Sequence, residues 1–207
     1  KLPSVEDEQN RQEQNGGRLI DFSVLKRPHL RKGVIGQVFY NGGQTAINSL
    51  FLVYCCTYAG IAESTATTFF GLYMLCFLLG RWVGTLLMGK FRPQDMLTVY
   101  AIANILLCVV VVCFGGMVGL YAMMAISFFM SIMYPTQFSL AIEDLGGQTK
   151  SGSAFLVMAI VGNAMLPQFT AFIMHCNPAI YHIAYLVPMV CFAFCANYGW
   201  RGYKAGR

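Results

Sequence analysis

The chain has 207 residues, of which 57% are hydrophobic and only 11% are charged, with a mean hydropathy of +0.56. This composition excludes an ordinary water-soluble domain and indicates a chain whose main solvent is lipid. The formal net charge of +5 comes from cations placed at the ends of apolar segments, so it gives no support to nucleic-acid binding.

Six hydrophobic runs, each near the roughly 20 residues that cross a bilayer as a helix, occupy residues 34–59, 67–88, 96–114, 118–142, 153–175 and 180–197. The 14 Lys and Arg residues all fall at or toward the ends of these runs that would share one side of a membrane. The connections on the other side, 60–66, 115–117 and 176–179, contain none. The positive-inside rule then puts both termini in the cytoplasm. The sequence therefore predicts an all-α membrane protein with six transmembrane helices.

The segment before the first run differs from the rest of the chain. Residues 1–17 are polar, rich in Gln, Asn and Glu, and lack the apolar core of a signal peptide. We interpret residues 1–30 as a cytoplasmic linker and residues 31–207 as one six-helix bundle. Because the first residue is Lys1, we expect the chain to be a piece of a longer protein.

Motifs for catalysis or metal binding are missing from the sequence. The eight cysteines lie in or beside apolar runs, which is typical of small buried side chains, and they predict neither a disulfide framework nor a metal site. No HExxH, GxSxG or P-loop motif occurs, so we expect neither an enzyme nor a cofactor. No Asp or Glu lies mid-membrane to carry a proton, so any proton coupling must come from another segment.

The first run is the most polar. Gln37, Asn41, Gln44 and Asn48 share one helical stripe, with Tyr40 beside it. Amides and a phenol suit a neutral polyhydroxy ligand such as a sugar, because they offer donors and acceptors without a charge. Such groups also bind neighbouring helices together in membranes. The run contains three glycines that would loosen the helix, a feature of transporter binding sites, at Gly36, Gly42 and Gly43.

The fourth and fifth runs carry weaker versions of this pattern. Ser127, Ser131 and Tyr134 share a helix face, and Pro135 follows at once. Since proline removes a backbone donor, we expect this helix to bend or break there. Asn163 lies in the middle of the fifth run, where either ligand binding or helix packing would explain it.

Arg81 is the only formal charge well inside a predicted span. Its guanidinium either extends to the membrane interface or pairs with a carboxylate of another segment, because the nearest in the chain, Glu143 and Asp144, close the fourth run at the surface. Gly80 and Gly84 flank Arg81 at a spacing that lets a neighbouring helix approach.

Four stretches resemble the fucose permease family of the major facilitator superfamily, whose relatives include glucose/galactose transporters. GQVFYNGGQTA (36–46), GRWVGT (80–85) and FMSIMYPTQFSL (129–140) are similar to that family's seventh, eighth and tenth helices. LGGQTKSGS (145–153) is similar to the loop that enters its eleventh helix.

The resemblance implies that this chain is the carboxyl-terminal half of a twelve-helix sugar/proton symporter of the bacterial inner membrane, with residues 1–30 ending the central loop. Its partners would be a monosaccharide, a proton, the lipid bilayer and the amino-terminal bundle, which would hold the proton-coupling carboxylates. The cavity would be lined by Gln37, Tyr40, Asn41, Gln44 and Tyr134, with Asn163 as an added polar group. The loop 84–93 would match a degenerate basic gating motif containing Lys90 and Arg92.

Two other interpretations remain open. A self-sufficient six-helix carrier or pore that homodimerises would use the amide stripe twice. A non-transporting membrane scaffold would use the amides and glycines only to join helices.

Overall fold

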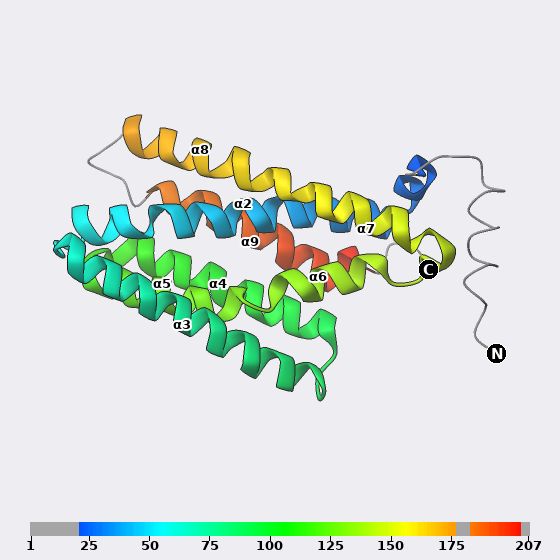
Figure 1. The fold of residues 1–207 in the computed structure, drawn as a ribbon, viewed down its shortest axis with the longest axis horizontal. Helices are drawn as coiled ribbons and strands as arrows, with labels where there is room; N and C mark the ends of the chain where they lie inside the picture. Colours follow the sequence, from blue (N-terminus) through cyan, green and yellow to red (C-terminus); the bar gives the residue numbers. More distant parts are fainter. Residues whose placement is uncertain (1–20, 177–182, 204–207) are drawn as a thin grey trace.

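A computed structural model describes residues 21–176 and 183–203, which form a bundle of helices lying side by side (Figure 1). The described residues contain no strand. The elements in chain order are η1 (Phe22–Lys26), α2 (Pro28–Thr57), α3 (Glu63–Met88), α4 (Pro93–Phe114), α5 (Gly116–Met130), α6 (Met133–Ile142), η2 (Gly146–Gln148), α7 (Thr149–Met158), η3 (Ala159–Val161), α8 (Gly162–Cys176), α9 (Leu186–Asn197) and the π-helical turn η5 (Tyr198–Gly202).

These helices confirm the predicted all-α membrane architecture. In the part of the chain that the structure describes, five helical stretches are long and apolar enough to cross a membrane: Glu63–Met88, Pro93–Phe114, Gly116–Ile142, Gly146–Cys176 and Ile183–Gly202. The remaining helix, α2, has 30 residues but is rich in amides and glycines. It is therefore the polar helix of the bundle. The first residues of the sixth predicted run lie outside the described residues, and the orientation of the termini stays a prediction.

Local sequence signals set the helix ends. Pro28 and Pro93 open α2 and α4, where the missing N–H costs nothing and the ring already has a helical φ. Gly115 and Gly116, with φ of 56° and 52°, make the turn between α4 and α5. This left-handed conformation favours glycine, and it allows a connection short enough to keep the two helices antiparallel.

Part of the predicted linker packs onto the bundle. The backbone N–H of Asp21 donates to the Ser151 hydroxyl at 3.1 Å, and Val24 is buried in a small cluster that includes Leu30 and Leu156. Residues 21–27 thus form a cap on the end of the bundle that carries Lys90, Arg92 and Lys150, which we call the basic end.

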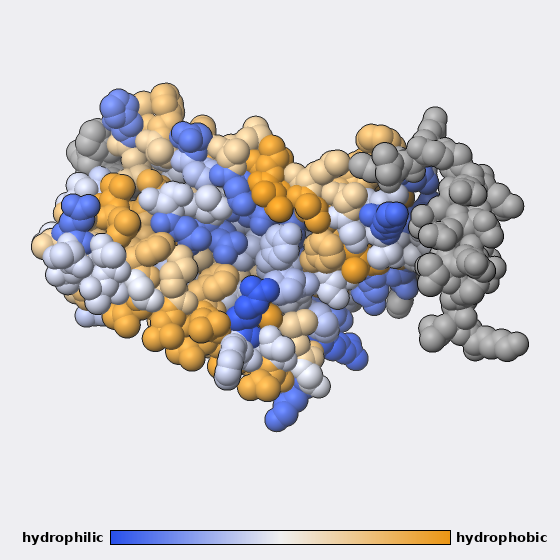
Figure 2. Space-filling model, in the orientation of Figure 1, coloured by the Kyte–Doolittle hydropathy of each residue, from blue (hydrophilic) through white to orange (hydrophobic). Residues whose placement is uncertain are grey.

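The interior is aromatic and the outer surface is apolar. The largest fully buried side chains include Tyr40, Tyr54, Tyr73, Tyr185 and Phe51. Outside, Leu86 and Trp82 are 75% and 70% exposed, as expected for side chains that would face lipid. Figure 2 shows hydrophobic residues on the outer helices and a broken band of hydrophilic residues along α2 across the middle of this face.

The fourth hydrophobic run is interrupted, as the sequence predicts. α5 ends at Met130 and α6 begins at Met133, which puts Pro135 in the first turn of α6. Pro135 has no N–H to offer the preceding turn, so carbonyls there need other donors. The buried Tyr40 hydroxyl donates to the Met130 carbonyl at 2.6 Å.

The expectation that glycines loosen the first helix is wrong. α2 runs unbroken from Pro28 to Thr57. A methyl group at Gly42 would overlap the Leu166 side chain, and one at Gly43 would lie 2.9 Å from Cys191 Cβ. The glycines therefore let neighbouring helices pack closely against α2.

A pair of tyrosines tests the role of the Tyr40 hydroxyl at the break. Tyr40→Phe leaves the Met130 carbonyl without this donor, so we expect a loss of roughly 1–3 kcal/mol in the free energy of unfolding. Tyr185 is equally buried, but its hydroxyl has no partner among the described residues. Tyr185→Phe is therefore expected to be neutral or stabilising. Thermal unfolding in detergent measures the stability of both variants. Equal shifts in unfolding temperature would show that the Tyr40 hydroxyl does not stabilise the helix break.

Candidate functional site

The polar stripe of α2 divides into a hidden part and a partly open part. Gln37 is 0% exposed and Asn41 is 4% exposed. Gln44, Thr45 and Asn48, one to three turns later, are half-buried. Within the bundle, the later part of the stripe is therefore the part that reaches the surface.

The open part of the stripe meets α8. The Thr45 hydroxyl donates to Asn163 Oδ1 at 2.8 Å, which joins a predicted site residue of the fifth run to α2. The two helices can approach because Gly162 lies against α2. A Cβ there would overlap the Val38 carbonyl oxygen and lie 3.0 Å from its carbon. Half-buried Asn163 is thus held beside half-buried Gln44 and Thr45 by backbone packing.

Asn48 ends the stripe on the side of α3. Its Oδ1 accepts a hydrogen bond from the Tyr73 hydroxyl at 2.5 Å. Tyr73 is fully buried, so this amide is tied to the aromatic core. It acts in helix packing, the alternative that the sequence left open for every amide of the stripe.

Tyr134 lies in the first turn of α6 and is half-buried. Its ring centroid is 6.2 Å from that of Tyr40 and 6.3 Å from that of Phe138. The interruption between α5 and α6 sets the direction of this turn, and no hydrogen bond of the Tyr134 hydroxyl occurs within the described chain. The hydroxyl is therefore available to a ligand.

Tyr40, another residue of the predicted site, is covered by its neighbours within the bundle. It is 0% exposed, and its hydroxyl already donates to the Met130 carbonyl. In this structure the Tyr40 hydroxyl stabilises the helix break, and the Tyr40 ring lies beside that of Tyr134.

Gln137 was missed as a candidate in the sequence. It is 0% exposed, and neither of its amide atoms has a partner among the described residues. Its Nε2 lies against Gly36, where a methyl group would overlap it. Gln137 lies three residues after Tyr134 and so on the same side of the helix, and this spacing could have revealed it.

Gln37 and Asn41, like Gln137, have buried amide atoms without partners among the described residues. Both amide atoms of Gln37 and the Nδ2 of Asn41 are buried without hydrogen-bond partners in the described part of the chain. Unpaired polar atoms in an apolar interior are costly. The buried amides of Gln37, Asn41 and Gln137 therefore lower the stability of the closed interior.

The predicted structural residues of α3 form a close contact with the helix break. A methyl group at Gly80 would overlap the Phe128 carbonyl oxygen, and one at Gly84 would lie 2.9 Å from Ile132 Cβ. Between them, Arg81 is exposed and forms no ion pair with a described carboxylate. Its charge is thus presented at the surface of the bundle, at the level of the α5–α6 interruption.

The remaining predicted gating residues lie at the basic end. Lys90 and Arg92 are exposed in the connection between α3 and α4, and Arg92 is the N-cap residue of α4. Among the described residues, no three His, Cys, Asp or Glu side chains come close enough to hold a metal ion.

Comparisons with known proteins identify the fold and its relatives. No protein-family model matches the chain. The chain is 36% identical to the L-fucose-proton symporter of Escherichia coli K12 over 195 residues, which cover 93% of the chain and 44% of the relative. It is 31% identical to a putative glucose/galactose transporter of Helicobacter pylori J99 over 207 residues, covering 99% of the chain and 49% of the relative.

A solved structure agrees. The crystal structure of the E. coli fucose:proton symporter superposes with a TM-score of 0.82 at 37% identity, covering 86% of this chain and 45% of that one. A second crystal structure, of that transporter in the outward conformation, gives the same TM-score of 0.82. The chain therefore spans about half the length of the relatives it matches.

Proposed function

Because the chain belongs to the fucose permease family of the major facilitator superfamily, we propose that it forms the carboxyl-terminal half of a sugar–proton symporter. The names of its relatives support a hexose or a deoxyhexose as the sugar. The matched share of those relatives, 44% and 49%, supports a second bundle in the complete carrier. Residues 31–207 would be the transmembrane half, with residues 1–30 joining it to the other half.

The observation that carries this proposal is a set of neutral, half-buried polar side chains on three helices, which we call the polar row. Gln44, the Thr45–Asn163 pair and Tyr134 are half-buried, come from three helices and bear no charge. Sugar hydroxyls both donate and accept hydrogen bonds, and amides and phenols match them in the same way. The sugar would lie between this row and the facing bundle.

Transport would proceed by alternating access, in which two bundles rock about a site near the membrane midplane. This half supplies the neutral wall of the site. The chain has no carboxylate within a predicted span, so the proton would load onto a carboxylate of the other half. Gly80 and Gly84 would keep α3 against α5 and α6 during the movement, and Arg81 would face the other bundle.

Two substitutions in the full-length carrier test this site. We expect Gln44→Ala and Tyr134→Phe each to weaken sugar binding about two- to tenfold, because a hydrogen bond contributes roughly 0.5–1.5 kcal/mol and about 1.4 kcal/mol is a factor of ten in affinity. Radiolabelled L-fucose and D-galactose uptake into vesicles, measured over a range of sugar concentrations, gives the apparent KM.

Tyr121→Phe is the matched control, because it removes the same atom from a residue of α5 that is 58% exposed and lies outside the polar row. It should leave uptake unchanged. If both site variants transport with the control's kinetics, Gln44 and Tyr134 do not bind the sugar.

A further inference from the structure

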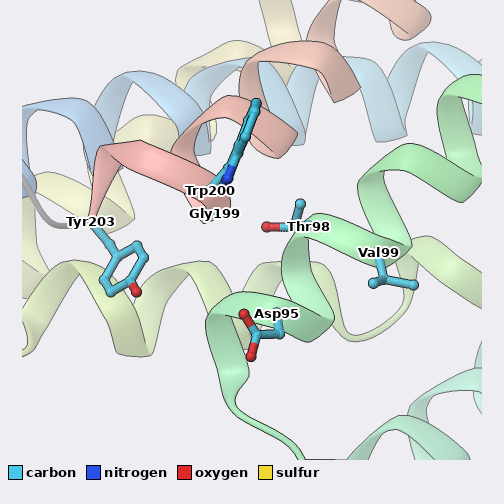
Figure 3. Close-up of a pocket in the computed structure, with 6 residues that line it drawn as sticks. All are labelled: Asp95, Thr98, Val99, Gly199, Trp200 and Tyr203. Atoms are coloured by element: carbon cyan, nitrogen blue, oxygen red, sulfur yellow. The ribbon is translucent and has the colours of Figure 1, made fainter.

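A pocket separate from the polar row lies at the basic end, between the first turns of α4 and the π-helical turn η5 (Figure 3). Its volume is about 340 Å³, near the lower limit of small-molecule sites. It is lined by Asp95, Thr98, Val99, Gly199, Trp200 and Tyr203.

Close packing of η5 on α4 forms the floor of this pocket. A Cβ at Gly199 would lie 2.6 Å from Thr98 Oγ1 and 3.2 Å from its backbone nitrogen, so only glycine fits this contact. The Thr98 hydroxyl donates to the Gln94 carbonyl at 2.9 Å and keeps its lone pairs for another donor. π-Helical turns are rare and often occur at functional sites.

Charges of opposite sign lie around the pocket. Among the described residues that line it, Asp95 is the one that carries a charge, and in Figure 3 its carboxylate and the Tyr203 ring lie on facing sides of the open space. On η5 the Arg201 guanidinium carbon is 4.7 Å from the centroid of the Trp200 ring. A ligand that carries both a cation and an anion would match this arrangement.

The pocket continues into an apolar stripe that begins at one of its own lining residues. On α4, Val99, Ile102 and Leu106 are 60%, 46% and 61% exposed and recur at helical spacing. Trp200, 64% exposed, is of the type that lies at membrane–water interfaces. The ligand therefore combines a polar headgroup with a hydrocarbon chain.

We propose that this pocket binds a phospholipid whose headgroup carries a primary ammonium next to its phosphate, as in phosphatidylethanolamine. The ammonium donates to the Asp95 carboxylate and to the Thr98 oxygen, and it lies beside the Tyr203 ring. The phosphate faces Arg201, and an acyl chain follows the α4 stripe. The bound lipid would hold η5 against α4 at the basic end.

Native mass spectrometry of the detergent-purified full-length protein tests the proposal. Dioleoyl phosphatidylethanolamine and dioleoyl phosphatidylglycerol are added separately at equal concentrations, and the bound fraction of each is measured. We expect phosphatidylethanolamine to bind more tightly, and Asp95→Asn to weaken its binding by about tenfold or more, because the ammonium loses a hydrogen bond to a charged group.

Glu143→Gln is the matched control, since Glu143 is an exposed carboxylate at the same end that does not line the pocket. It should bind phosphatidylethanolamine as the unmodified protein does. Val99→Phe fills the pocket without a change in charge and should also reduce binding, which decides the matter if Asp95→Asn does not fold.

Three results would overturn the proposal: equal binding of the two lipids, unchanged binding by folded Asp95→Asn, or thermal stabilisation by soluble glycerophosphoethanolamine equal to that by the lipid. The last would mean that a soluble zwitterion is the occupant. Sugar uptake by Asp95→Asn is measured in parallel, because the lipid site and the sugar site are separate predictions.

Discussion

Gly80→Ala is expected to destabilise the bundle severely, although it adds only one methyl group. The methyl would overlap the Phe128 carbonyl oxygen and lie 2.8 Å from the Phe128 carbonyl carbon. A backbone carbonyl cannot move aside by changing a rotamer, so α3 must separate from α5. Overpacking of this kind costs roughly 1–3 kcal/mol and sometimes more.

Gly71→Ala in the same helix is the control, because no atom of a neighbouring described helix lies within 4 Å of the added methyl. Alanine favours a helix over glycine by up to about 1 kcal/mol, so this variant should be neutral or slightly more stable. Thermal unfolding followed by size-exclusion chromatography in detergent compares the two. Equal unfolding temperatures would show that α3 and α5 do not pack as described.

Proteoliposomes that contain this chain alone are expected to accumulate no sugar under an imposed proton gradient. The chain offers one wall of a cavity, and its sequence has no Asp or Glu inside a predicted span. A proton cannot be carried through hydrocarbon without a titratable group. Uptake should therefore equal that of empty liposomes.

The full-length carrier, reconstituted at the same protein-to-lipid ratio, is the positive control and should accumulate sugar until the gradient collapses. Accumulation by the chain alone that a protonophore abolishes would refute the half-carrier proposal. It would favour the homodimeric carrier that the sequence leaves open.

The helices and the break in the fourth run could be predicted because each rests on a local property. Hydrophobic length determines where a chain crosses lipid, and Pro135 removes a donor wherever it stands. The same reasoning failed for Gly42 and Gly43, because glycine permits two opposite outcomes. Glycine loosens an isolated helix, but it also lets neighbouring helices pack closely against it. Which of the two occurs depends on the neighbours, here Leu166 and Cys191.

The candidate site, too, could be predicted from the sequence only in part. Periodicity correctly put Gln37 and Gln44 on one stripe, but it could not tell which of them the neighbouring helix covers. In the structure Gln37 is fully buried, whereas Gln44 remains half-buried beside α8. Gln137 escaped notice because its partner surface, Gly36, lies about a hundred residues away in the chain.

The glycines of α2 have a mechanical consequence. Through Gly36, Gly42 and Gly43 this helix touches the side chains of Gln137 on α6, Leu166 on α8 and Cys191 on α9 at separations that leave no clearance. Because α2 is closely packed on three sides, it can neither rotate about its axis nor move along it. If the polar row is to face first one side of the membrane and then the other, α2, α6, α8 and α9 must tilt together as one rigid body.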